Sequence, residues 1–167
     1  MSGKHNHNLS YMDVSLISPY GTVVELVSSW SGMAFNGTVF DDEASTTIGN
    51  GSAPYLGSFQ PKGSLSDFDQ EEMKGVWTLY IYNSSSNSAS ISEWSLNITS
   101  DNSTPEDPPS SPGTEYTGSS ISVSSYAVSE GTLTISDNGT ITDINVEMSG
   151  KHNHNLSYMD VSLISSY

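Results

Sequence analysis

The chain has 167 residues, of which 19 are acidic and 4 are basic, so its formal net charge is −15. This charge excludes nucleic acid and anionic membranes as main partners, because both need clustered cations, and no apolar run approaches the roughly 18 to 20 residues that membrane insertion needs. The absence of cysteine excludes a disulfide framework and a thiolate metal site, and the length allows one domain with a buried core.

The chain begins with a segment that it later repeats. Residues 1–18 recur unchanged as residues 148–165, and the first difference beyond them sets Pro19 against Ser166. The second copy is preceded by ITDINVE, which reads as the first half of a strand that continues into the copy. The duplication indicates that the chain starts inside a strand of its own fold.

The predicted elements are strands throughout. Apolar and polar residues alternate in residues 12–18, 76–82 and 92–99, as expected for strands with one buried face. The residues predicted to face the core are Met12, Val14 and Leu16, then Trp77, Leu79 and Ile81, then Trp94, Leu96 and Ile98.

The same alternation continues in residues 121–128, 131–136 and 141–148. In the last of these, Ile144, Val146 and Met148 are predicted to point inward and Asp143, Asn145 and Glu147 outward. No stretch has a convincing helical period. Many short strands separated by turn residues predict an all-β fold, a jelly-roll-like β-sandwich.

Residues 100–119 contain four prolines and many small polar residues. This composition favours an extended, solvated connector and is predicted to form an interdomain linker. A long surface loop within one domain is the alternative.

Five sequence blocks between residues 16 and 99 resemble the P domain, also called Homo B, which follows the catalytic domain of subtilisin-like proprotein convertases and of many secreted bacterial proteases. The blocks are LISPYGTVVEL, VFDDEA, GSAPYLGSFQPKGSLSDF, KGVWTLYIYN and SEWSLNIT. Residues 121–165 resemble the amino-terminal strands of the same family. The resemblance implies a P-domain-like sandwich.

The order of these parts differs from the order in the family, where the amino-terminal strands precede the LISP block. The resemblance therefore implies a sandwich in residues 1–99 that lacks its first strands, a linker in 100–119, and the first strands of the next P-domain repeat in 120–167. An incomplete sandwich exposes an apolar face and open edges, so strands from the C-terminal segment or from a neighbouring chain are expected to complete it. A tandem array, strand donation between chains and an engineered permutant are the three alternatives.

Asp41, Asp42 and Glu43 form the first candidate metal site. Adjacent carboxylates repel one another unless a cation neutralises them, and hard oxygen ligands suit calcium. The family resemblance also implies calcium here, with Asp41 and Asp42 as ligands. A solvated acidic turn is the alternative.

Asp13, Asp67 and Asp69 are further candidate ligands. Asp67 and Asp69 belong to the acidic run SDFDQEE, which forms either a second cluster or a solvated turn. Many relatives carry an aspartate before the LISP strand, where this chain has Tyr11 with Asp13 close by, so the resemblance supports a second calcium site less well.

Sequons for N-glycosylation are frequent, and their abundance favours an extracellular or cell-surface location. The candidate asparagines are Asn8, Asn36, Asn50, Asn83, Asn97, Asn102, Asn138 and Asn155.

No catalytic constellation is found in the sequence. The Asp, His and Ser motifs of subtilisin-like catalysis are absent, and all four histidines belong to the duplicated segment. We therefore expect a non-catalytic extracellular structural or adhesive module, a calcium-stabilised P-domain repeat that binds copies of itself head to tail, with a glycan or surface ligand as a further partner. The alternative is an accessory P domain that stabilises a secreted subtilisin-like protease or binds its substrate.

Overall fold

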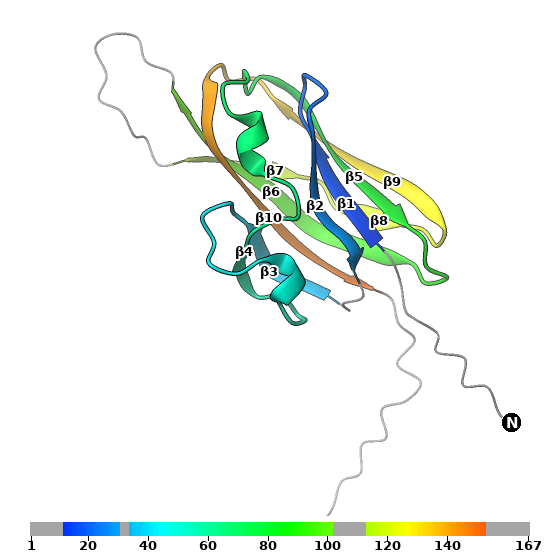
Figure 1. Cartoon of the computed structure of the whole chain (residues 1–167). Helices are drawn as coiled ribbons and strands as arrows, with labels where there is room; N and C mark the ends of the chain where they lie inside the picture. The colour runs from blue at the N-terminus through cyan, green and yellow to red at the C-terminus, as the bar shows by residue number, and fades with distance from the viewer. Residues whose placement is uncertain (1–11, 31–33, 102–112, 153–167) are drawn as a thin grey trace, which may run out of the picture.

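The fold consists of two β-sheets packed face to face. The computed structural model describes residues 12–30, 34–101 and 113–152 (Figure 1). The four-stranded sheet has the order β2 (Val23–Trp30), β1 (Met12–Ile17), β5 (Gly75–Asn83) and β9 (Ala127–Ile135). The six-stranded sheet has the order β4 (Gly57–Phe59), β3 (Ala34–Phe40), β10 (Thr140–His152), β6 (Ala89–Asp101) and β7 (Thr114–Gly118), and β8 (Ile121–Val123) also pairs with β6.

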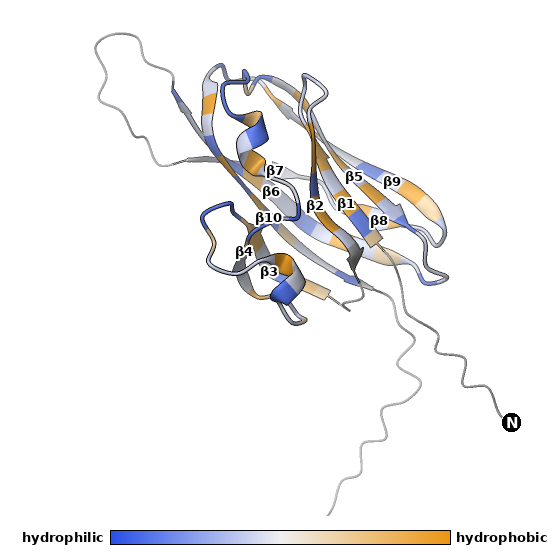
Figure 2. Cartoon of the chain, in the orientation of Figure 1, coloured by the Kyte–Doolittle hydropathy of each residue, from blue (hydrophilic) through white to orange (hydrophobic). Residues whose placement is uncertain are grey.

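The core lies between the two sheets and is built by the period-two pattern of the strands. Every residue that the sequence predicts to face the core in β1, β5, β6 and β10 is buried. Hydrophobic and hydrophilic residues alternate along these strands (Figure 2). The prediction of an all-β sandwich is therefore confirmed.

Two buried tryptophans show how the polar parts of large core residues are satisfied. The indole N–H of Trp77 donates to the carbonyl of Met73 at 2.9 Å, and that of Trp94 donates to the carbonyl of Ser119 at 3.1 Å. The ring of Trp94 lies so close to Gly118 that a Cβ atom there would come within 2.1 Å of it. Only glycine at this position lets β7 pack over Trp94.

Two short 3-10 helices lie in the connections between β3 and β5. The first is η1 (Ile48–Asn50), and the second is η2 (Leu65–Phe68). Phe68 at the end of η2 packs edge-on against Trp77, with the ring centroids 5.1 Å apart. This contact fixes η2 against the core and holds its polar side at the rim of the sandwich.

The carboxyl-terminal part of the chain completes the sandwich that residues 12–101 begin. Strand β10 lies between β3 and β6, and β9 pairs with β5 along its whole length, from Gly75 opposite Ile135 to Asn83 opposite Ala127. The expectation that added strands fill the gap is thus met by the same chain. Residues 121–152 share one sandwich with residues 12–101.

The two copies of the repeated segment contribute to different strands of the sandwich. The first copy supplies residues 12–17 as β1, and the second supplies residues 148–152 as the end of β10. The corresponding residues 159–164 and 1–5 lie outside the described residues. Within the described residues, the two copies therefore supply different parts of the repeated segment to one sandwich.

Two segments differ from their predicted structure. Strand β7 begins at Thr114, inside the segment expected to be a linker, because the prolines end at residue 112 and the polar run that follows pairs with β6. The predicted strand 121–128 is divided by a turn at Tyr126, whose φ of 51° is incompatible with an extended strand.

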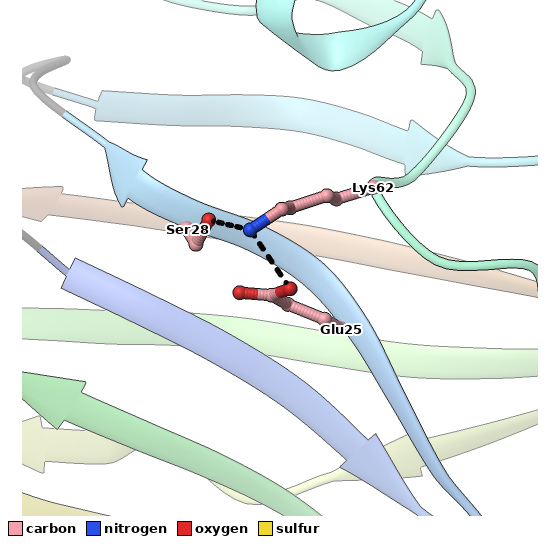
Figure 3. Close-up of polar contacts among 3 residues, drawn as sticks. All are labelled: Glu25, Ser28 and Lys62. Carbon is pink, nitrogen blue, oxygen red and sulfur yellow. Dashed lines mark hydrogen bonds and ion pairs between the residues drawn. The ribbon is translucent and has the colours of Figure 1, made fainter.

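The outer edge of β2 is covered by the segment that follows β4. The backbone N–H groups of Lys62 and Gly63 donate to the carbonyls of Leu26 and Glu25 at 3.1 and 2.7 Å. The Lys62 ammonium also reaches the Glu25 carboxylate at 3.0 Å and the Ser28 hydroxyl (Figure 3). Because the ion pair is exposed, the backbone hydrogen bonds contribute more than the charges to holding this segment against β2.

Candidate functional site

An acidic cluster lies at the rim of the six-stranded sheet, where β3 ends. Asp41, Asp42 and Glu43 follow Phe40, which pairs with Val146 of β10. Because β10 runs antiparallel to β3, Asp143 lies alongside the residues that follow Phe40. The pairing of the strands therefore adds a fourth carboxylate to the three that are adjacent in sequence.

Asp42 is held by the amino end of η2. Its carboxylate accepts hydrogen bonds from the backbone N–H groups of Leu65 (3.0 Å) and Ser66 (2.9 Å) and from the Ser64 hydroxyl (2.8 Å). Partial burial alone would raise the pKa of Asp42, but these hydrogen bonds outweigh it, so the pKa lies below its ordinary value of 3.8. Asp42 is thus an ionised cap of the short helix.

Asp41 and Glu43 form a tight turn and interact with each other. The backbone N–H of Glu43 donates to Oδ1 of Asp41 at 2.7 Å. The contact between their carboxyl groups is the main cause that raises the pKa of Glu43 above its ordinary value, and partial burial and the charge of Asp143 add to it. The turn therefore disfavours the ionised form of Glu43.

Asp143 and Asp69 complete the cluster. Partial burial, followed by the charges of Asp41 and Asp42, raises the pKa of Asp143. Burial also raises the pKa of Asp69, with the charges of Asp143 and Asp42 as further causes. At this rim the ionised forms of Glu43, Asp69 and Asp143 are therefore disfavoured, in part by neighbouring negative charges, and a bound cation would relieve that repulsion.

The geometry of the cluster limits which residues could hold a cation. Among the residues that the structure describes, no three Asp, Glu, His or Cys side chains are arranged so that they could hold a metal ion. Asp42 is already engaged by η2 through both of its oxygens. Asp41, Glu43 and Asp143 are the better candidates, and they would have to move together before they could coordinate calcium with carbonyl or water oxygens.

The other predicted ligands are not brought into one site. Asp13 lies in β1 of the four-stranded sheet, opposite Tyr82, whereas the cluster lies on the six-stranded sheet. Asp67 lies in η2 and is exposed. Asp143 was missed as a candidate ligand because only its outward direction follows from the sequence, whereas its nearness to residues 41–43 depends on the pairing of β10 with β3.

The sequons occupy very different environments. Asn36, Asn50, Asn97 and Asn138 are exposed, whereas Asn8, Asn102 and Asn155 lie outside the described residues. Asn83 is fully buried, and its side-chain nitrogen donates to the carbonyls of Asn87 (2.8 Å) and Ser124 (2.9 Å). A glycan is attached through this same nitrogen, so the folded structure excludes Asn83 as a glycosylation site.

A shallow polar depression of about 280 Å³ lies on the outer face of the six-stranded sheet. Its lining residues are Val39, Ser95, Asn97, Glu115, Asn145 and Glu147. Oδ1 of Asn145 is buried without a hydrogen-bond partner, while the amide nitrogen contacts Asp143 at 3.4 Å. The lining contains no aromatic ring on which a sugar would stack, so the depression lacks the usual carbohydrate platform.

Comparison with known families agrees with this architecture. Residues 4–98 match the proprotein convertase P-domain family. The chain belongs to the proprotein convertase P-domain family. This P domain is a non-catalytic accessory domain, typical of secreted proteases.

The matched residues do not include the whole sandwich. They contain β1 to β5 and most of β6, whereas β7 to β10 follow them in the chain and still complete the same two sheets. No curated protein and no solved structure matches the chain significantly. No helix in the described part of the chain is long and apolar enough to cross a membrane.

Proposed function

We propose that this chain is a repeat unit of a non-catalytic extracellular structural protein, in which P-domain sandwiches assemble head to tail with copies of themselves. The proposal covers the whole protein, whereas the family match concerns the P domain alone. The acidic surface, which would keep such an assembly soluble, and the four exposed sequons are in keeping with an extracellular location.

One observation carries the proposal: within the described residues, the sandwich takes different parts of the repeated segment from its two copies. It takes residues 12–17 from the first copy and residues 148–152 from the second. The second copy continues with residues 159–164, which have the same sequence as β1. We therefore propose that this stretch supplies the β1 sequence of a following repeat.

We further propose that calcium stabilises each sandwich at the rim. The support is electrostatic, because neighbouring carboxylates contribute to raising the pKa values of Glu43 and Asp143. Since they are not prearranged as a metal site, calcium would bind only as the turn at residues 41–43 adjusts, and the affinity should be modest. A ligand present at 100 times its Kd stabilises the folded state by about 2.7 kcal/mol.

Particle size and thermal unfolding test both parts. Light scattering of the purified chain over a wide range of concentrations should show head-to-tail oligomers, and millimolar calcium should raise the melting temperature relative to a chelator. The variant D41N/E43Q should lose the calcium response, whereas E72Q, which changes an exposed residue outside the cluster, should keep it. A particle of single-chain mass at every concentration, with a melting temperature indifferent to calcium, would contradict the proposal.

The family match favours one alternative, an accessory domain that stabilises a secreted subtilisin-like protease or binds its substrate. The two functions differ in what the native polypeptide contains. Mass spectrometry of the native protein would find peptides of a catalytic region in the accessory case and peptides from further copies of this repeat in the structural case.

A further inference from the structure

We propose that the outer edge of β9, the side that faces away from β5, pairs with β9 of a second copy of this chain. The two strands would run antiparallel across a twofold axis that relates Gly131 to itself. Among the described strands, β9 lies at the margin of the four-stranded sheet and pairs with β5 alone (Figure 1). The proposal goes beyond head-to-tail assembly, because it names a lateral contact that does not depend on a repeat architecture.

The two margins of the four-stranded sheet are covered to different extents. At the β2 margin, the backbone of residues 62–63 hydrogen-bonds to the edge, and the inward side chains of Val24 and Leu26 are buried. At the β9 margin, no strand of the described chain pairs with the outer edge, and the inward residues between Ala127 and Leu133 are only half-buried. A further strand beside β9 would cover residues that this sandwich leaves partly open.

The β9 edge lacks the features that normally prevent edge-to-edge pairing. The strand has nine residues and pairs with β5 without a bulge. It contains no proline and no lysine, and Glu130 is its single charged residue. Val128, Thr132, Thr134 and Ile135 are β-branched, which favours an extended ladder. Long and regular edges of this kind readily accept another strand.

The sequence of β9 is complementary to itself when Gly131 lies opposite Gly131 of the second copy. In this register the whole strand is paired, Glu130 faces Thr132 of the second copy, and Val128 faces Thr134. Like charges are therefore not directly opposed, and β-branched side chains lie opposite each other. A shift of the centre to Glu130 would bring two carboxylates face to face, and every shift shortens the ladder. Backbone groups alone would accept any extended segment, whereas this side-chain pairing favours a second copy.

The expected association is reversible. Alternate residues of a strand direct their N–H and C=O groups to the same side, so a ladder of nine residues makes about eight to ten backbone hydrogen bonds between the copies. Those groups are hydrated in the separate chains, so the net gain for each bond is modest. The net charge of −15 opposes association, and salt at about 0.15 M screens it beyond about 8 Å.

The twofold arrangement limits the size of the particle. Each copy uses the same edge, so the contact is isologous and closes after two chains. The two four-stranded sheets would become one continuous sheet of eight strands. Head-to-tail assembly, by contrast, leaves an unused surface at each end and continues to grow.

Opposite charges at Thr132 test both the pairing and its register. Thr132 is exposed, T132K places an ammonium opposite Glu130 of the second copy, and T132E places a carboxylate there. Sedimentation equilibrium in 0.15 M salt should show reversible dimers, with the dimer dissociation constant lowered about threefold or more in T132K and raised about threefold or more in T132E. The controls S58K and S58E make the same charge changes at an exposed residue of β4 and should stay within about twofold of the wild type.

The gain expected in T132K keeps the test independent of any loss of folding. Melting temperatures close to that of the wild type will show that the variants at Thr132 and Ser58 are folded. Equal dissociation constants in T132K and T132E overturn the proposal. Single-chain mass in T132K at every concentration also overturns it, and would leave the edge to a segment of another protein.

A cross-link identifies the register directly, because the chain has no cysteine of its own. Directly opposed residues of antiparallel strands lie within disulfide range. A mixture of E130C and T132C, one of them carrying a mass tag, should therefore form mixed disulfide dimers under mild oxidation. The control mixture of T132C and T134C should form far fewer mixed dimers, because the register sets these two residues four positions out of alignment. Equal yields in the two mixtures overturn the proposed register and with it the proposal.

These outcomes are distinct from those that test head-to-tail assembly. Oligomers that grow with concentration and are equally stable in T132K and T132E support head-to-tail assembly and overturn the β9 pairing. A particle that stops at two chains and responds oppositely to the two substitutions supports the β9 pairing and contradicts head-to-tail growth.

Discussion

Different forces determine the stability of the interior at β1 and of the rim at Asp41–Glu43. At β1 the apolar side chains are buried between two sheets, and their contribution to stability does not depend on pH. At the rim, carboxylates lie close to one another, and the free energy of unfolding depends on which of them is ionised. The comparison indicates that the interior fixes the fold, whereas the rim is the place where ions and protons can adjust its stability.

The largest loss of stability is expected from a substitution in the interior, at a position outside the repeated segment. Leu79 of β5 is 0% exposed and lies opposite Leu16 and Gly131. Leu79→Ala should lower the free energy of unfolding by about 2 to 5 kcal/mol, because it leaves a cavity that the sheets can only partly close. Urea unfolding measures this change. The control V76A, at an exposed position of the same strand, should change stability by less than about 0.5 kcal/mol. Similar losses of stability in both variants would contradict the distinction between buried and exposed positions of β5.

A somewhat smaller loss of stability is expected from a substitution where β7 packs over Trp94. Gly118→Ala adds a Cβ that would lie 2.1 Å from the indole ring, so either β7 or Trp94 must shift. Overpacking of this kind costs about 1 to 3 kcal/mol. Urea unfolding and the fluorescence of Trp94 should both change, whereas Thr117→Ala, at an exposed neighbour, should leave them unaltered. An unchanged stability for Gly118→Ala would show that β7 is not fixed against the core.

The interior was also the easier region to predict from the sequence. Alternation of apolar and polar residues identifies the inward side chains of β1, β5, β6 and β10, because a strand has one buried face whatever its neighbours are. The division of residues 121–128 was missed because the turn depends on a positive φ at Tyr126, a conformation that tyrosine does not signal in a sequence.

The rim could be predicted only in part. The carboxylates of Asp41, Asp42 and Glu43 are adjacent in the chain, so their mutual repulsion is visible in the sequence. The engagement of Asp42 as a helix cap depends on η2, and the addition of Asp143 depends on the order of strands in the sheet. Such contacts between distant segments cannot be read from local patterns.

At the rim, Asp42 should be the most stabilising carboxylate. Asp42→Asn weakens the cap of η2 and should cost about 1 kcal/mol at neutral pH, as other helix caps do. Because the pKa of Asp42 is lowered in the folded state, this contribution is present above the ordinary pKa of 3.8 and is lost as the pH falls through the folded value. Urea unfolding should therefore show a smaller difference from wild type at pH 3 than at pH 7. Asp67→Asn is the control, and a loss that is equal at both pH values would contradict the charge-dependent cap.

The smallest and most specific change in stability is expected at Asp143, where a substitution should increase stability instead of lowering it. Because the pKa values of Asp143 and Glu43 are raised in the folded state, the folded protein binds more protons than the unfolded one just above their ordinary values of 3.8 and 4.5, so stability falls as the pH rises through this window. Asp143→Asn removes part of the repulsion and should increase stability at pH 7 by a few tenths of a kcal/mol, with no gain at or below pH 3. Calcium should reduce this gain, because the wild-type carboxylates are neutralised by the ion and the variant has one ligand fewer. Glu130→Gln, on the other sheet, removes an equal charge, so an equal gain there would assign the effect to the net charge of −15 rather than to the rim.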